Sequence, residues 1–169
     1  MSQVQTLTPT YIPPTRPQVR TRQPVRPAAP PSLFRCLIVS ASEKRLAMLR
    51  QAAEEQGWDP ILCESAPEAS REAIRNRVLM AVVDLDTAGH GPPDGFEELA
   101  ERLAGESGRL LLVCGNEDDA LEEIWARQLG AWMYLPGVDD RSDVAMVVGE
   151  AKNVAEKLLG PADQFTATI

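Results

Sequence analysis

The sequence predicts an α/β fold, a (βα)5 doubly wound parallel sheet with helices on both faces. Three observations indicate it. Five short apolar segments alternate with five stretches of helical periodicity, and strict alternation with short links is typical of parallel sheets. The segment 78–83 is apolar throughout and ends at Asp84, as in a central strand buried on both faces. The body is also long enough to bury about two-thirds of its unfolded surface, so its core needs no metal or disulfide.

The five predicted strands are short apolar runs, each stopped by polar residues, glycine or proline. In chain order they are 33–39, 60–63, 78–83, 110–113 and 131–135.

The five predicted helices carry apolar residues three and four positions apart. In chain order they are 43–56, 68–76, 94–103, 118–129 and 142–159. Ser42 is the expected N-cap of the first helix and Gly57 its stop. We expect Ile74 on the inner face of the second helix, and Leu121 and Ile124 on the inner face of the fourth.

The ends of the chain differ in composition from its body. Residues 1–32 carry eight prolines and four arginines but no acidic residue. Such a stretch buries too little apolar surface to offset its ordering entropy, so we expect a disordered tail with polyproline II bias. Its PxxP spacings fit a plain linker, or a motif that docks in aromatic-lined grooves. We expect one folded domain over 33–160 and a flexible tail over 161–169, after Gly160-Pro161 ends the last helix.

Composition excludes several classes of function. The net charge is −8, and the part of the chain beyond the basic tail carries −12, which disfavours a folded DNA-binding domain. No apolar run approaches the roughly 20 residues that span a bilayer, and the chain does not begin with a secretory signal. Three scattered cysteines and one histidine predict a cytoplasmic protein without a disulfide framework or a multi-histidine metal centre.

Four motifs follow one another with the expected elements between them. They are 66–69 (APEA), 80–85 (MAVVDL), 94–99 (DGFEEL) and 130–135 (GAWMYL). In this order they resemble the receiver domain of response regulators, the chemotaxis-regulator-like branch of the flavodoxin-like folds. The resemblance covers nearly the whole body. It implies a three-layer sandwich with a phospho-acceptor at Asp84, on the carboxyl edge where such sheets carry their sites.

The resemblance also implies a magnesium site, but the residues depart from it. A hard dication needs oxygen anions, and it neutralises the incoming phosphoryl group. The positions of the family's acidic pair fall on Ser40 and Ala41, which supply one neutral hydroxyl between them. Asp86 and Glu43 are the nearest acids that could assist Asp84. Each lost preorganised charge is worth about 2.7–4 kcal/mol in rate, so phosphoryl transfer is expected to be slower by several orders of magnitude.

Further positions depart from the family pattern or match it without deciding a role. The lysine that the family places after the fifth strand is absent, because Pro136-Gly137 stands there. The position where the family has a hydroxyl residue, at the end of the fourth strand, is occupied by Cys114.

Tyr134 matches the family's aromatic switch residue. Trp125 and Trp132 lie on the fourth helix and fifth strand. Receivers dimerise or bind partners through the face formed by the fourth helix, fifth strand and fifth helix, so the two tryptophans mark an interface or belong to the core.

These observations favour a stand-alone degenerate receiver, or pseudo-receiver: a non-enzymatic signalling and protein-interaction module without a cofactor, in which Asp84 is structural. Its expected partner is a histidine kinase, a downstream signalling protein or a second copy of the chain. In the alternative, Asp84 is phosphorylated in a two-component phosphorelay with bound Mg²⁺. Two other hypotheses stay open. One is a flavodoxin-like cofactor site after the first strand, where 40–42 lacks glycine, and the other is RNA or membrane binding through the tail.

Overall fold

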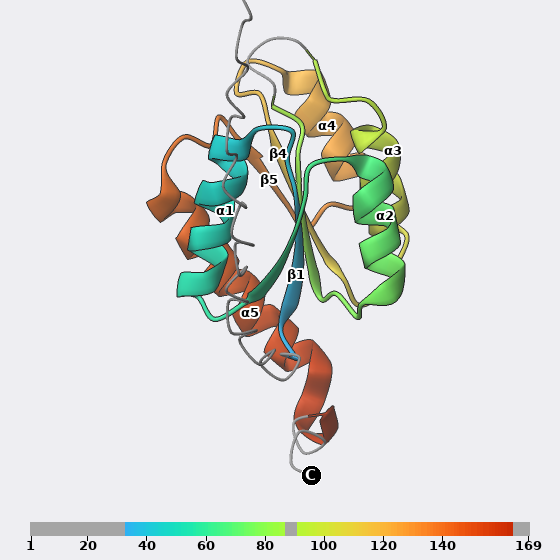
Figure 1. Ribbon diagram of the computed structural model, residues 1–169, viewed down its shortest axis with the longest axis vertical. Helices are drawn as coiled ribbons and strands as arrows, with labels where there is room; N and C mark the ends of the chain where they lie inside the picture. Colours follow the sequence, from blue (N-terminus) through green and yellow to red (C-terminus); the bar gives the residue numbers. More distant parts are fainter. Residues whose placement is uncertain (1–32, 87–90, 164–169) are drawn as a thin grey trace, which may run out of the picture. The chain divides into compact units, whose positions relative to one another are not determined.

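Five parallel strands form one sheet in the order β2-β1-β3-β4-β5 (Figure 1). The computed structural model describes residues 33–86 and 91–163. The strands are β1 Arg35–Val39, β2 Asp59–Cys63, β3 Met80–Asp84, β4 Leu110–Gly115 and β5 Met133–Pro136. The helices are α1 Glu43–Glu55, α2 Ala66–Arg75, α3 Phe96–Ala104, α4 Ala120–Leu129 and α5 Arg141–Asp163.

Helices cover both faces of the sheet, with α1 and α5 on one side and α2, α3 and α4 on the other (Figure 1). Because side chains alternate along a strand, β1 feeds two cores. Cys36 and Ile38 pack toward α1 and α5, whereas Leu37 and Val39 pack toward α2 and α3. The central strand β3 is buried along its whole length. This three-layer arrangement confirms the predicted fold class.

The residues expected to cap or interrupt α1 and α5 do so in the structure. The side chain of Ser42 caps α1 by accepting a hydrogen bond from the backbone N–H of Arg45 at 3.4 Å. Gly57 follows the end of α1 with a φ of 75°, which favours glycine. In α5, Gly160 has a φ of 64° and interrupts the helix.

The starts of two helices differ from the prediction. Helix α2 begins at Ala66, two residues earlier than expected, because Pro67 is compatible with a first helical turn. Helix α3 begins at Phe96 rather than Asp94. Gly95 adopts a φ of 78°, so it turns the chain into the helix instead of belonging to it.

The predicted inner faces of α2 and α4 are wrong at three positions. Ile74 is 83% exposed, Leu121 77% and Ile124 51%. Both helices pack on the sheet through small residues instead. The fully buried positions are Ala69 in α2 and Ala126 in α4. Ile74 lies five residues from Ala69, and Leu121 and Ile124 lie five and two residues from Ala126.

Some predictions fall on residues that the structure does not describe. The disordered tail over 1–32 and the last residues, 164–169, lie outside the described part of the chain. Over 33–86 and 91–163, no helix is both long enough and apolar enough to cross a bilayer.

Candidate functional site

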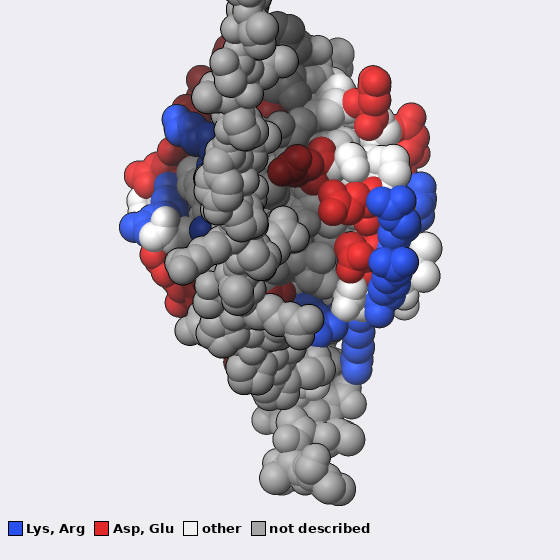
Figure 2. Space-filling model, in the orientation of Figure 1, with Lys and Arg blue, Asp and Glu red and all other residues white. Residues whose placement is uncertain are grey.

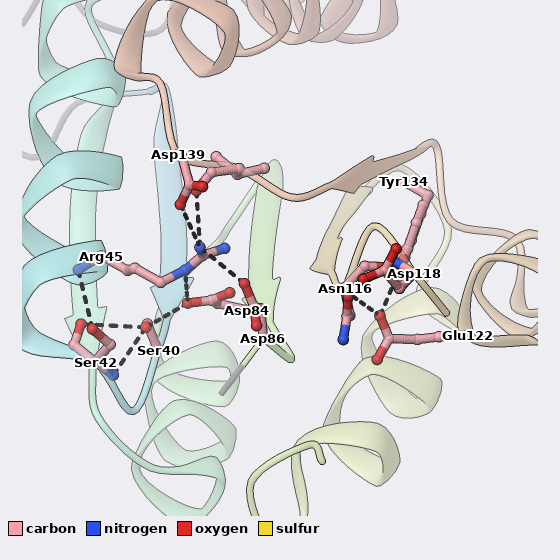
Figure 3. Close-up of polar contacts among 11 residues, drawn as sticks. Ser40, Ser42, Arg45, Asp84, Asp86, Asn116, Asp118, Glu122, Tyr134 and Asp139 are labelled. Carbon is pink, nitrogen blue, oxygen red and sulfur yellow. Dashed lines mark hydrogen bonds and ion pairs between the residues drawn. The ribbon is translucent and has the colours of Figure 1, made fainter. Parts of the chain in front are cut away.

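The carboxyl ends of β1, β3 and β4 meet at one edge of the sheet, beside the first turn of α1 and the connection from β5 to α5 (Figure 3). The register pairs Val39 with Val83 and Asp84 with Cys114, so these strands end at the same level. The expected site residues of β1 and β3 therefore lie together, as the sequence predicts for a doubly wound sheet.

Asp84 ends β3 and is almost completely enclosed, with 1% of its surface exposed. Its Oδ2 accepts two hydrogen bonds, from Ser40 Oγ at 2.7 Å and from Arg45 Nε at 2.8 Å. Its Oδ1 is also buried and has no hydrogen-bond partner in the structure. A buried carboxylate is costly unless it is paired and hydrogen-bonded, and Arg45 is its cationic partner.

Arg45 lies in the first turn of α1, and its side chain crosses the sheet edge (Figure 3). Besides the contact with Asp84, its Nη1 donates to Asp86 Oδ2 at 3.2 Å and to the carbonyl oxygen of Val138 at 2.8 Å. Asp139 Oδ1 lies 4.0 Å from the same nitrogen. Only 13% of the Arg45 side chain is exposed, so its contacts with Asp84 and Asp86 are largely shielded from water, whereas Asp139 is solvent-exposed.

The charge of Arg45 is stabilised by its surroundings. Burial acts to lower the pKa of the guanidinium, but the hydrogen bond and negative charge of Asp84, with the charge of Asp86, outweigh burial and raise it. We call Ser40, Arg45, Asp84 and Asp86, together with the Val138 carbonyl, the Arg45 cluster. It joins α1, the ends of β1 and β3, and the β5–α5 connection.

Sequence reasoning found most of this cluster but missed Arg45. Ser40 lies where expected and donates to Asp84, and Asp86 lies beside Asp84 across the same guanidinium. The sequence pattern allows an inward Arg45 but does not require one. Asp84 ends β3 and Asp86 follows it, no acidic pair follows β1, and Arg45 precedes the buried Leu46 of α1.

Two other expected site residues make no polar side-chain contact with this cluster. Glu43 is exposed in the first turn of α1, where its negative charge stabilises the helix by interacting with the positive end of the helix dipole. Ala41 is exposed in the β1–α1 connection and has no polar side-chain atom to offer.

Tyr134 points inward and is held by polar contacts at the end of β4 (Figure 3). Its hydroxyl lies 2.8 Å from Glu122 Oε1 and 3.0 Å from the carbonyl oxygen of Asn116. Glu122 Oε1 also accepts from the backbone N–H of Asn116 at 3.0 Å. Burial, the hydrogen bond to Glu122 and the negative charge of Glu122 raise the pKa of Tyr134.

The structure does not bring Cys114 and Tyr134 together. Cys114 is fully buried in the core beneath α1 and α5, whereas Tyr134 packs in the opposite core. Burial raises the pKa of the Cys114 thiol, and the charge of Asp84 raises it further. The residue of β4 that faces Tyr134 is Gly115, where a Cβ atom would collide with Tyr134 and Glu122.

Trp125 and Trp132 are both half-buried and pack against opposite cores. Leu121 and Ile124 on α4 are more exposed than either tryptophan, and Met133 is partly exposed on the edge strand β5.

A magnesium ion of the kind implied by the family resemblance does not fit the residues at this edge. The two carboxylates that would coordinate it, Asp84 and Asp86, share one guanidinium, and a dication placed among them would be repelled by Arg45. Among the described residues, no group of three or more histidine, cysteine or acidic side chains is arranged to hold a metal. A flavin phosphate fits no better, because Ser40 contacts Asp84 and Ser42 caps α1.

Several solved structures with this architecture are response-regulator receiver domains. A CheY-like receiver domain protein from Methanospirillum hungatei superposes with a TM-score of 0.64 at 20% identity, over 75% of this chain and 98% of its own. The chain has the receiver fold. A receiver domain of a putative Luxo repressor protein from Vibrio parahaemolyticus matches with a TM-score of 0.62 at 16% identity, over 79% and 98% of the two chains.

A third receiver-fold structure, a response regulator from Thermotoga maritima, gives a TM-score of 0.59 at 18% identity, over 70% of this chain and 97% of its own. No family model matches the sequence, and no curated protein matches it. The likeness therefore concerns the receiver fold, and the chemistry of the sheet edge is read from this chain's own side chains.

Proposed function

We propose that this chain is a non-enzymatic signalling module of the receiver fold, which binds a protein partner and is not switched by phosphorylation of Asp84. The observation that carries the proposal is the bond between Arg45 and Asp84. Receiver-fold neighbours that are response regulators support the signalling role.

The geometry of Asp84 opposes its use as a nucleophile. To accept a phosphoryl group, a carboxylate oxygen must reach the phosphorus in line with the leaving group. Oδ2 is engaged by Ser40 and Arg45, and Oδ1 is buried. The negative charge that a phosphoryl group adds would meet Asp86 and the Arg45 cation, because Pro136-Gly137 and not a lysine stands directly at the end of β5.

Phosphorylation chemistry tests this proposal. The full chain is incubated with acetyl phosphate and Mg²⁺, or with a phosphorylated histidine kinase, and its mass is measured beside a receiver known to accept phosphate. We expect no added phosphoryl group on this chain. A phosphoryl group on the native chain that is absent from Asp84→Asn would overturn the proposal.

The second candidate, a phosphorylatable receiver, is favoured by one observation. Asp84 Oδ1 has no partner in the structure, so one oxygen of the carboxylate is not committed to a hydrogen bond. In that function Arg45 would turn from Asp84 to the phosphoryl group. The same mass measurement distinguishes the two functions, because only the second gives a labelled Asp84.

We further propose that the partner, or a second copy of the chain, binds the face formed by α4, β5 and α5. Leu121 and Ile124 are three residues apart on α4 and both exposed, and Met133 is exposed on the edge strand β5. Apolar side chains that gather on a surface are typical of protein interfaces.

Matched substitutions test this face. Leu121→Asp on α4 is compared with Ile74→Asp on α2, since both side chains are strongly exposed. Capture of a partner and self-association, measured by pull-down and light scattering with and without residues 1–32, are expected to weaken only in Leu121→Asp. Equal effects of the two substitutions would contradict the assignment.

A further inference from the structure

A cavity of about 460 Å³ lies between the first turns of α1 and the β5–α5 connection. We call it the Met48 cavity, and its lining includes Ala41, Lys44, Arg45, Met48, Val138 and Asp139. Small-molecule sites in proteins typically have volumes of about 300–1,000 Å³. The Met48 cavity is therefore large enough for a small organic ligand, since one water molecule occupies only about 30 Å³.

Hydrogen bonds hold both walls of the cavity in place without a ligand. Arg45 Nη1 donates to the carbonyl oxygen of Val138 at 2.8 Å and so joins α1 to the β5–α5 connection (Figure 3). Ser42 caps the start of α1, and Asp140 Oδ1 accepts from the backbone N–H of Ser142 at 2.9 Å. A site that is already formed loses less free energy to ordering when a ligand binds.

The Met48 cavity is distinct from the buried carboxylate of Asp84. Asp84 is only 1% exposed, and it does not line the cavity. The Arg45 side chain lines the cavity and donates to Asp84 through Nε. A ligand in the cavity therefore meets Arg45 and not the carboxylate at which the family resemblance implies a phosphoryl group and a metal ion.

Part of the lining is apolar. Met48 is half-buried and packs against the core beneath α1 and α5. Val138 belongs to that core, and the methyl group of Ala41 extends the apolar surface. An apolar group that covers these side chains releases water from both surfaces, which favours binding. The cavity thus suits a ligand with an apolar body.

Lys44 is the cation of this lining that has no ion-pair partner. Its side chain is exposed, and it forms no ion pair with any residue that the structure describes. Arg45, by contrast, is engaged by Asp84 and by the Val138 carbonyl. Asp139 lies on the facing wall and would repel an acid group placed there. A negatively charged ligand group is therefore most stable beside Lys44.

We propose that the Met48 cavity binds a small apolar carboxylate, with its carboxylate beside Lys44 and its apolar body against Met48 and Val138. Such a ligand contacts α1 and the connection into α5 together, so its binding stabilises the folded chain. It would give the signalling module an input that does not pass through Asp84. The inference does not depend on whether Asp84 is phosphorylated.

Nuclear magnetic resonance of the full chain tests the inference with octanoate and benzoate as probes. The neutral controls are octanol and benzyl alcohol, which have matching apolar bodies. We expect saturable shifts of the amides of Ala41, Lys44, Met48 and Val138 with at least one of the acids. Its neutral counterpart should bind about two- to fivefold more weakly, as expected for the loss of one exposed ion pair. The absence of such shifts with both acids, or equal affinity for acid and alcohol, would overturn the inference.

Substitutions on the walls assign the ligand to this cavity. Lys44→Gln should weaken acid binding about two- to fivefold and leave alcohol binding unchanged, whereas Lys44→Arg should keep it. Arg50→Gln, at an exposed position of α1 outside the lining, is the matched control and should bind as the native chain does. Met48→Trp fills the cavity and should abolish the binding of all four compounds, with circular dichroism to show that it is folded. Equal effects of Lys44→Gln and Arg50→Gln, or full binding by a folded Met48→Trp, would overturn the inference.

Discussion

Arg45 and Asp84 form a buried ion pair, and such pairs respond asymmetrically to substitution. Removing one partner leaves a charge in a low-dielectric site, which typically costs about 3–5 kcal/mol of stability. Removing both is nearly neutral, because the cost of burying charge disappears as well. Ser40, the other donor to Asp84 Oδ2, supplies a hydrogen bond but no charge.

We predict that Arg45→Ala lowers the free energy of unfolding by about 3–5 kcal/mol, and that adding Asp84→Ala recovers much of the loss. Urea denaturation of the single and double variants measures both. Arg141→Ala is the control, since the pair of Arg141 with Glu55 is largely solvent-exposed and should cost about 0–1 kcal/mol. An equally small effect at Arg45 would show that the cluster is not a stabilising pair.

A second residue-scale prediction concerns Tyr134. Its raised pKa means that the folded state keeps the phenolic proton to higher pH than the unfolded chain does. The contribution of Tyr134 to stability is therefore fully present below the ordinary tyrosine pKa of 10.0 and is lost as pH rises above it. In Glu122→Gln the pKa of Tyr134 should move down while staying above 10.0, because burial persists. Ultraviolet titration in a Tyr11→Phe background measures it, and an unchanged pKa would contradict the role of Glu122.

At the residue scale, the sequence placed Asp84 correctly because the end of a continuous apolar strand is a strong signal. It did not reveal Arg45. An arginine one position before a buried leucine in a helix is compatible with a solvated or an inward side chain. The choice depends on charges 39 and 41 residues away, which only the fold brings near.

At the scale of elements, β4 and β5 approach closely where Tyr134 crosses the end of β4. Gly115 allows this contact, since a Cβ atom there would meet Glu122 and Tyr134. Glycine is needed at position 115 because a side chain would not fit there. Backbone strain is not the reason, since Gly115 is not among the glycines with positive φ.

We predict that Gly115→Ala lowers stability by about 1–3 kcal/mol through overpacking and shifts the fluorescence or near-ultraviolet signal of Tyr134. Gly105→Ala is the matched control, because its Cβ would have only ordinary contacts, the nearest at 3.5 Å, with φ in the right-handed helical region. If thermal unfolding shows the same loss of stability for both substitutions, the close contact at Gly115 does not explain the need for glycine at that position.

The elements also show where periodicity alone is a poor guide. In α5, Val144, Val148 and Ala151 are buried as predicted, since a long helix buries one wide stripe. In α4 the prediction was wrong at Leu121 and Ile124, which are exposed while the small residue Ala126 is buried. Trp125 and Leu129 of the same helix do pack against the core. When a short helix packs through an alanine, its sequence indicates poorly which face is buried. In α4 the buried face is identified only by the structure.

At the scale of the whole molecule, acidic and basic side chains are mixed on part of the surface although the composition is acidic. The body is strongly acidic, yet Figure 2 shows basic side chains beside acidic ones over α2, where Arg71 and Arg75 are exposed.

All three cysteines are free and buried, so we predict that the native protein resists thiol reagents. Burial raises the pKa of Cys63 to about 12, with a further contribution from the charges of Glu68 and Glu72, and burial raises the pKa of Cys36 and Cys114 as well. A colorimetric disulfide reagent should titrate three thiols in denaturant and almost none in the native state. Rapid reaction of a native cysteine would contradict this packing.

The claim that Asp84 is withdrawn from phosphoryl chemistry by Arg45 is tested most directly by nuclear magnetic resonance. Amide spectra of the full chain are recorded during titration with Mg²⁺ and beryllofluoride, which mimics an aspartyl phosphate. We predict that the amides of Ser40, Asp84 and Gly115 keep their positions throughout. Saturable shifts at these amides that disappear in Asp84→Asn would contradict the claim.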